Sequence, residues 1–278
     1  MATVGLPMYD LSELRAATDA WWTGIARALR REGIDDIPER LTRDLSTEAI
    51  WQRPDLLLSQ ICGYNMIGER RQRLTYVATP FYTAPGCDGP LYRSHIVVPA
   101  NAPAQTIEEL RGLRCAINGY MSHSGCNALR ATVAPLARDG RFFSSVTVSG
   151  GHALSLALLA SGEADVAAID CITYALMARC QSRLAEDTRI VAQTVAAPVG
   201  PYVTCGHASD DFVARLRRGL LRAMSDPDLA AARADLLLDG IETLPVEDYA
   251  RIARIKAEAE SLGYRDFDSE KTVREQQA

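Results

Sequence analysis

The amino-acid sequence predicts an α/β protein with two lobes, each a mostly parallel sheet flanked by helices. Three observations lead to this prediction. The chain has 278 residues, more than one average domain, and short apolar runs alternate with helical patterns along it. Two extended segments, 91–99 and 191–204, are interpreted as crossover strands that form a hinge. Lobe one is therefore expected to comprise residues 1–92 and 199–278, and lobe two, residues 93–198, is expected to be inserted into it.

Composition narrows the class of protein. The formal net charge is −5, and the basic residues, nearly all arginines, are scattered among acids, which argues against nucleic acid as a partner. No run of about 18 apolar residues occurs, so membrane insertion is not expected. The seven cysteines show no C-x-x-C spacing and are predicted to be reduced. Without metal-ligand spacing or a phosphate-binding P-loop, neither a metal nor a cofactor is expected.

The first residues bear on the cellular compartment. A secretory signal has a basic start followed by roughly 7–15 apolar residues, whereas MATVGLPMYD contains Pro7 and Asp10. The chain as written is therefore expected to be cytoplasmic, and periplasmic if the true start lies upstream.

Lobe one is expected to begin with a strand and a helix. ATVGLP has the composition of a short strand, and apolar residues then recur from Leu14 to Leu29 at helical spacing. Asp10 and Glu13 have the spacing of a capping box for that helix. PDLLLSQ and RLTYVAT are predicted to be further buried strands, and three helices are predicted after Thr204.

Lobe two is expected to contain three strands whose ends face a ligand. These strands are RCAIN, SSVTVSGG and DVAAID, and helices are predicted at 126–136 and 153–161. In open parallel sheets, ligands bind outside the carboxyl ends of the strands, where helix N-termini also point. The loops after these strands are therefore the candidate ligand contacts.

The first of these loops is NGYMSHSG, Asn118 to Gly125. Helix N-termini expose unpaired N–H groups and the positive end of the helix dipole, so an anion there gains hydrogen bonds. Ser122 and Ser124 would add hydroxyl donors, and Gly125 would allow close approach of the backbone. The alternative is that either serine only caps its own helix.

The second loop, SGGH, places Ser149 and two glycines before a helix that starts near His152. Two glycines in this position are costly unless the backbone geometry requires them. His152 could donate a hydrogen bond to an anionic oxygen. The alternative is a structural or solvated histidine.

The third candidate is Asp170, at the end of DVAAID. A carboxylate repels an anion unless it accepts a proton that the ligand still carries, which would select protonated oxyanions. The alternative is that Asp170 caps a helix that starts near Thr173.

These residues resemble those of a known family. The succession TIEELRGLRCAIN, SHSG and FFSSVTVSGGHALSLALLASGEADVAAID, between about Thr106 and Tyr174, resembles the phosphate, phosphite and phosphonate-binding proteins of ABC transporters. The resemblance implies the type II periplasmic-binding-protein fold and closure of a hinge around a small anion. It also implies a set of ligand contacts from both lobes: Ser122, Ser124, Gly125, His152, Asp170, Tyr64, Tyr82 and Tyr9.

The resemblance has one departure in the first loop. The family usually has three adjacent hydroxyl residues before the glycine, and His123 replaces the middle one here. His123 is therefore a further candidate contact that would change the selectivity for anions. The function expected is capture of a phosphate- or phosphonate-like oxyanion for uptake or sensing, with an ABC transporter permease as a partner.

Two other functions compete with this one. A cytosolic enzyme on the same two-lobed fold would act on a small anionic metabolite, using His123, His152 and Asp170 for acid–base chemistry or a cysteine such as Cys62, Cys126 or Cys171 as a nucleophile. The sequence shows no nucleophile elbow, so we expect a binding protein and not an enzyme. A regulatory ligand-binding domain ranks last, because no DNA-binding segment precedes the first strand.

Overall fold

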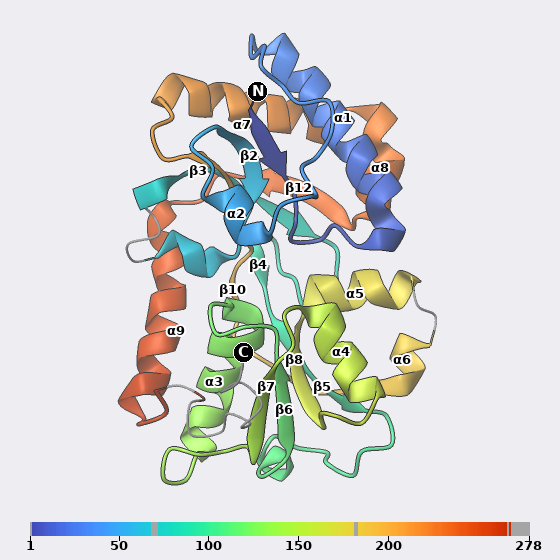
Figure 1. The fold of residues 1–278 in the computed structure, drawn as a ribbon, viewed down its shortest axis with the longest axis vertical. Helices are drawn as coiled ribbons and strands as arrows, with labels where there is room; N and C mark the ends of the chain where they lie inside the picture. The colour runs from blue at the N-terminus through green and yellow to red at the C-terminus, as the bar shows by residue number, and fades with distance from the viewer. Residues whose placement is uncertain (1, 68–71, 181–182, 266, 268–278) are drawn as a thin grey trace. The chain divides into compact units, whose positions relative to one another are not determined.

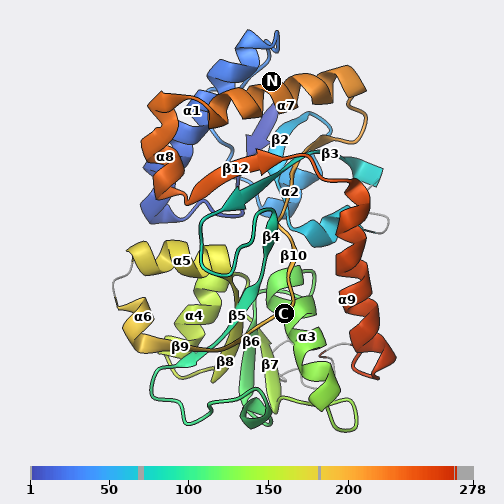
Figure 2. The same cartoon turned by 180° about the vertical axis from the view of Figure 1, so that it is seen from behind.

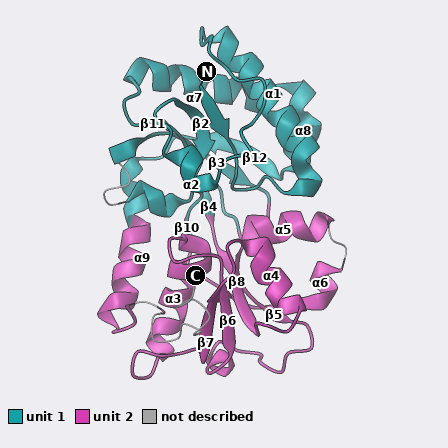
Figure 3. Ribbon diagram, in the orientation of Figure 1, with its two compact units in different colours: residues 1–83, 87–91, 198–250 teal, residues 84–86, 92–197, 251–278 magenta. Residues whose placement is uncertain are grey.

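The computed structural model describes residues 2–67, 72–180, 183–265 and 267, and it divides into two compact units (Figure 3). Unit 1 consists of residues 1–83, 87–91 and 198–250. Unit 2 consists of residues 84–86, 92–197 and the chain from Arg251 on. The chain passes between the units at a short two-stranded sheet of β4 (Leu91–Tyr92) and β10 (Ala197–Pro198). This passage coincides with the two extended segments of the sequence.

Unit 1 contains a mixed five-stranded sheet in the order β1-β2-β11-β3-β12 (Figure 1). The strands are β1 (Thr3–Gly5), β2 (Leu56–Gln60), β3 (Leu74–Tyr82), β11 (Tyr202–Cys205) and β12 (Leu238–Glu242). β1 and β2 are parallel, whereas β11 runs antiparallel to β2 and β3, and β12 antiparallel to β3. The sheet is therefore less parallel than the alternation of strand and helix patterns indicates, because the chain re-enters unit 1 through β11.

The helices of unit 1 pack on this sheet through apolar stripes. They are α1 (Arg15–Arg31), α2 (Thr47–Trp51), α7 (Asp210–Met224) and α8 (Ala230–Asp235). α7 begins at a Ser209 cap that accepts a hydrogen bond from Phe212 N at 3.2 Å. α1 packs closely on α7, since a Cβ added at Gly219 would lie 2.4 Å from Leu29 Cδ2. Trp21 and Trp22 of α1 are buried in the core.

Unit 2 contains a second five-stranded sheet in the order β7-β6-β8-β5-β9. The strands are β5 (Ser94–Pro99), β6 (Arg114–Ile117), β7 (Ser145–Val148), β8 (Val166–Asp170) and β9 (Thr188–Gln193). β6 is parallel to both β7 and β8, and β5 is antiparallel to β8 and β9. The carboxyl ends of β6, β7 and β8 therefore meet at one edge, as the sequence predicts.

Helices flank this sheet on two sides (Figures 1 and 2). α3 (Ala128–Val133) and α9 (Ala250–Ser261) lie on one flank, and α4 (His152–Ala160), α5 (Cys171–Cys180) and α6 (Leu184–Asp187) lie on the other. The three strands and the positions of α3 and α4 agree with the prediction from the sequence.

Two expectations from the sequence are wrong. The sequence predicts that residues 199–278 belong to lobe one, yet the chain from Arg251 on belongs to unit 2, because Ala259, Tyr264 and Phe267 are buried in the same apolar core as Phe143. The capping box of Asp10 and Glu13 does not form. Asp10 instead accepts a hydrogen bond from Arg43 Nε at 2.5 Å, and a 3-10 turn without a side-chain cap precedes α1.

Candidate functional site

The loops that follow β6, β7 and β8 bring together most of the unit 2 residues that the sequence singles out. The β6 loop carries Ser122 and Ser124, the β7 loop leads to His152 at the start of α4, and β8 ends at Asp170. Because the three strands are parallel neighbours, their ends share one edge of the sheet.

Ser122 organises the first loop. Its Oγ accepts a hydrogen bond from Gly125 N at 3.1 Å, which caps the turn of π-helix His123–Asn127 that precedes α3. The capping role that the sequence leaves open is therefore present for Ser122. Gly125 is required for a steric reason, since an added Cβ would lie 2.1 Å from Asn118 Oδ1.

Ser124 and His152 form the central contact between the two loops. Ser124 Oγ lies 2.8 Å from His152 Nε2, and Ser122 Oγ lies 3.3 Å from Ser124 Oγ. Asn118 Nδ2 is 3.4 Å from the same imidazole nitrogen. The Ser94 hydroxyl donates to the Ser124 carbonyl oxygen at 2.9 Å, which ties the loop to β5. These contacts hold hydroxyl, amide and imidazole groups in one cluster.

The SGGH turn has the backbone geometry that its glycines suggest. Gly150 has a φ of +91°, a conformation that residues with side chains rarely adopt, and Gly151 caps α4. The Ser149 hydroxyl lies 3.1 Å from the Ile117 carbonyl oxygen and 2.7 Å from Ser155 Oγ. Ser149 therefore fixes the turn that presents His152.

Both histidines of the site are neutral at physiological pH. Burial lowers the pKa of His152 to about 4, and the nearby Ala168 carbonyl opposes this effect only in part. Burial also lowers the pKa of His123 to about 4. The His123 side chain is 2% exposed, and its ring lies 6.4 Å from the Tyr92 ring in an edge-to-face arrangement. The structure thus places His123 beneath the loop, against Tyr92.

Asp170 caps α5. Its Oδ1 accepts hydrogen bonds from Ile172 N at 2.8 Å and Thr173 N at 3.0 Å, and the residue is 2% exposed. Ser94 is its register partner across β5 and β8. The helix-capping role is therefore present, and the carboxylate lies at the same sheet edge as the Ser124–His152 pair.

The three tyrosines that the sequence selects lie in unit 1. Tyr9 and Tyr82 contact each other edge to face, with ring centroids 5.2 Å apart, and both are buried. The Tyr82 hydroxyl is hydrogen-bonded to the Gln60 side chain, which also donates to the Gly200 carbonyl at 2.9 Å. Tyr64 lies in the 3-10 turn η2 (Gly63–Met66) and is half-buried.

Sequence patterns did not identify three polar residues of these clusters: Ser94, Asn118 and Gln60. Asn118 opens the loop that was singled out, so its position was a usable signal. Ser94 and Gln60 follow no motif, because Ser94 reaches the site on an antiparallel strand and Gln60 acts through a tyrosine from another strand. Among the described residues, no group of three or more potential metal ligands is present, and no helix there is long and apolar enough to cross a membrane.

Comparison with known proteins identifies the family of this chain. The family model described as "ABC transporter, phosphonate, periplasmic substrate-binding protein" matches residues 62–249 of the chain. No curated protein matches the sequence.

Solved structures share the fold at low sequence identity. PhnD1 from Prochlorococcus marinus in complex with methylphosphonate is 15% identical, with a TM-score of 0.74 over 95% of this chain and 98% of that one. A binding protein component of an ABC phosphonate transporter from Pseudomonas aeruginosa is 13% identical, with a TM-score of 0.74 over 94% of this chain and 87% of that one. A Xanthomonas citri protein bound to ATP is 16% identical, with a TM-score of 0.69 over 94% and 98%. These matches confirm the predicted periplasmic-binding-protein fold.

Proposed function

We propose a ligand class for this chain, which belongs to the periplasmic substrate-binding proteins of phosphonate ABC transporters: a small phosphoryl oxyanion, either phosphate-like or a phosphonate. Membership of the family establishes a solute-binding role. The family is a component of transporters and not a class of enzymes, so we propose that this chain binds its ligand without converting it.

The observation that carries the proposal is the hydrogen bond between Ser124 and His152 at 2.8 Å, which joins two loops at the carboxyl ends of parallel strands. Each loop leads into a helical segment, and the N–H groups at such ends favour an anion. We propose that Ser122, Ser124, Gly125 and His152 contact the phosphoryl oxygens. His123 is assigned to support of the loop from below.

The charges of the cluster suggest which form of the ligand binds. None of these contacting side chains is cationic, because His152 is neutral at pH 7, and the buried carboxyl of Asp170 lies at the same edge. A dianion would lie near the Asp170 carboxyl and would meet no cationic side chain among the contacts proposed above. We therefore propose that the singly charged, protonated form of the oxyanion is preferred.

Three further contacts and a partner complete the proposal. Tyr9, Tyr64 and Tyr82 are proposed to contact the ligand from unit 1, as the family resemblance implies. The family description is periplasmic, so we propose that this chain acts in the periplasm and delivers its ligand to an ABC transporter permease.

A thermal-shift screen tests the proposal. The panel comprises phosphate, phosphite, methylphosphonate, ethylphosphonate, small sulfonates and small carboxylates. Selective binding to the folded state raises the melting temperature by mass action. We expect a rise with at least one phosphoryl anion and a larger rise at pH 6 than at pH 8, where the dianion dominates.

Paired variants locate the binding to the Ser–His cluster. The Ser124→Ala, His152→Ala double substitution is expected to abolish the shift, because it removes hydrogen bonds to a charged ligand that are together worth at least about tenfold in affinity. Ser12→Ala with His207→Ala is the matched control, since both side chains lie in unit 1 and both residues are exposed. No response to any phosphoryl anion would overturn the proposal, as would phosphorus NMR showing that a bound phosphonate is converted.

A further inference from the structure

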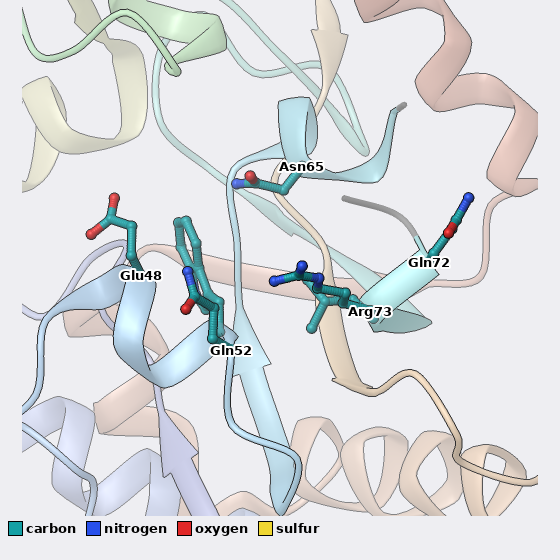
Figure 4. Close-up of a pocket in the computed structure, with 7 residues that line it drawn as sticks. Glu48, Gln52, Asn65, Gln72 and Arg73 are labelled. Carbon is teal, nitrogen blue, oxygen red and sulfur yellow. The ribbon is translucent and has the colours of Figure 1, made fainter. Parts of the chain in front are cut away.

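A cavity of about 430 Å³ opens in unit 1, and none of the candidate oxyanion contacts lines it. Its walls come from three separate parts of the chain: α2 and the residue after it, the turn η2, and the residues around the start of β3 (Figure 4). This volume is in the range of pockets that hold small metabolites. The polar side chains in the walls are Glu48, Trp51, Gln52, Asn65, Gln72 and Arg73.

Two opposite charges face this cavity from different walls. Glu48 projects from α2, and Arg73 extends from the start of β3 toward the α2 side, while Gln72 points the other way (Figure 4). Both charged residues are exposed, and within the described parts of the chain neither side chain has a hydrogen bond or an ion pair. Nearby charges in the same unit do pair, since Arg53 Nε lies 2.9 Å from Asp55 Oδ1. Among the described residues, no side chain therefore competes with a ligand for Glu48 or Arg73.

The remaining walls suit a small organic molecule with polar ends. Trp51 offers a half-buried aromatic surface, and its indole Nε1 is covered by protein and has no acceptor among the described residues. Asn65 is 4% exposed and presents an amide from η2, opposite the amide of Gln52 on the α2 side (Figure 4). The walls thus combine one negative group, one positive group, the amides of Gln52 and Asn65, and an aromatic face.

We propose that this cavity binds a small zwitterion, with its ammonium group toward Glu48, its carboxylate toward Arg73 and its carbon chain against Trp51. A ligand with one charge would satisfy only one of the two side chains, whereas a zwitterion satisfies both. Because both side chains are exposed, each contact is weak, and a dissociation constant on the order of millimolar is expected. This inference is independent of the oxyanion site.

A ladder of ω-amino acids tests the proposal. Glycine, 4-aminobutyrate and 6-aminohexanoate differ in the separation of their charges, and butyrate and butylamine serve as single-charge controls. Titrations followed by amide chemical shifts in NMR report both affinity and location. At least one member of the ladder is expected to shift the resonances around α2, η2 and the start of β3, and to bind at least about threefold more tightly than either control.

Charge variants separate recognition from a structural effect. Glu48→Gln and Arg73→Gln are each expected to weaken binding about threefold to fivefold. The double reversal Glu48→Arg, Arg73→Glu is expected to restore binding, because the zwitterion can turn around. The single reversal Glu48→Arg is expected to bind glutarate, a dicarboxylate, in place of the zwitterion.

Three controls complete the experiment. Glu39→Gln with Arg40→Gln makes the same charge changes at exposed positions of unit 1 that do not line the cavity, and is expected to leave binding unchanged. Trp51→Phe removes the unpartnered indole donor but keeps an aromatic wall, and is also expected to bind. Binding is expected to persist in the Ser124→Ala, His152→Ala variant. Absence of binding by every member of the ladder would overturn the proposal, as would failure of the double reversal to rescue it.

Discussion

The polar side chains at the strand ends of unit 2 differ from the charged side chains around the unit 1 cavity in the hydrogen bonds that they make within the protein. In unit 2, Ser124 and His152 are hydrogen-bonded to each other, and Asp170 caps a helix. In unit 1, Glu48 and Arg73 are exposed and make no side-chain hydrogen bond within the described residues. The first cluster is part of the packed fold, so changes there should alter both stability and binding. Changes around the cavity should alter binding alone.

The largest effect is expected at Gly125. In Gly125→Ala, the new Cβ would lie 2.1 Å from Asn118 Oδ1 and 3.2 Å from His152 Cε1, so the buried Asn118 side chain, the loop or both must move beside the Ser124–His152 contact. Such overpacking typically costs 1–3 kcal/mol, and we expect urea unfolding to show a loss of about 2 kcal/mol. The shift in melting temperature with phosphoryl anions should disappear. Gly119→Ala is the matched control, because nothing lies within 4 Å of an added Cβ there; equal stability of the two variants would contradict the prediction.

The second prediction concerns pH. The pKa values of His123 and His152 are about 4 in the folded protein, against an ordinary value of 6.5. As the pH falls, the unfolded chain takes up these protons first. The stability that depends on neutral histidines is therefore complete above about pH 6.5, declines between pH 6.5 and 4, and changes no further below that.

The loss of stability at low pH is expected to arise from His123 and His152, which both belong to unit 2. For the deeply buried His123, this lowering of the pKa corresponds to a loss of about 3 kcal/mol in the free energy of unfolding at low pH. For the half-buried His152 the loss is expected to be smaller. His152→Gln is expected to make the decline shallower in urea unfolding curves measured from pH 7.5 to 4. A slope that is insensitive to His152→Gln would contradict the lowered pKa, because it would show that this ring takes up its proton over the same pH range in the folded and unfolded states.

The sequence predicted the elements of unit 2 well because their signals are local. Three buried strands, each followed by small and polar residues, are visible as short apolar runs, and parallel pairing then places their ends together. The paired glycines before His152 were also informative, and Gly150 does adopt a positive φ. For Asp170, a local pattern could state the capping alternative but not decide it.

The parts that the sequence did not predict depend on contacts between distant residues. Ser94 reaches Ser124 through antiparallel pairing of β5 with β8. Asp10 is held by Arg43 and not by its own helix. The apolar residues after Arg251 have no local property that assigns them to the core of unit 2. Glu48 and Arg73 are 25 positions apart and share a cavity only because α2 and the start of β3 pack near each other.

The smallest effect on stability is expected at the unit 1 cavity. Glu48→Gln and Arg73→Gln, alone or together, should change the free energy of unfolding by less than about 0.5 kcal/mol, because neither side chain has a hydrogen-bond or ion-pair partner to lose among the described residues. Asp165→Asn is a suitable reference in unit 2, since Asp165 accepts hydrogen bonds from Arg114 N and Nη2 at 2.9 and 2.7 Å. Its loss is expected to cost about 1 kcal/mol. A cost above that reference for either cavity variant would show that Glu48 or Arg73 supports the fold, and the proposed difference between the two clusters would then no longer hold.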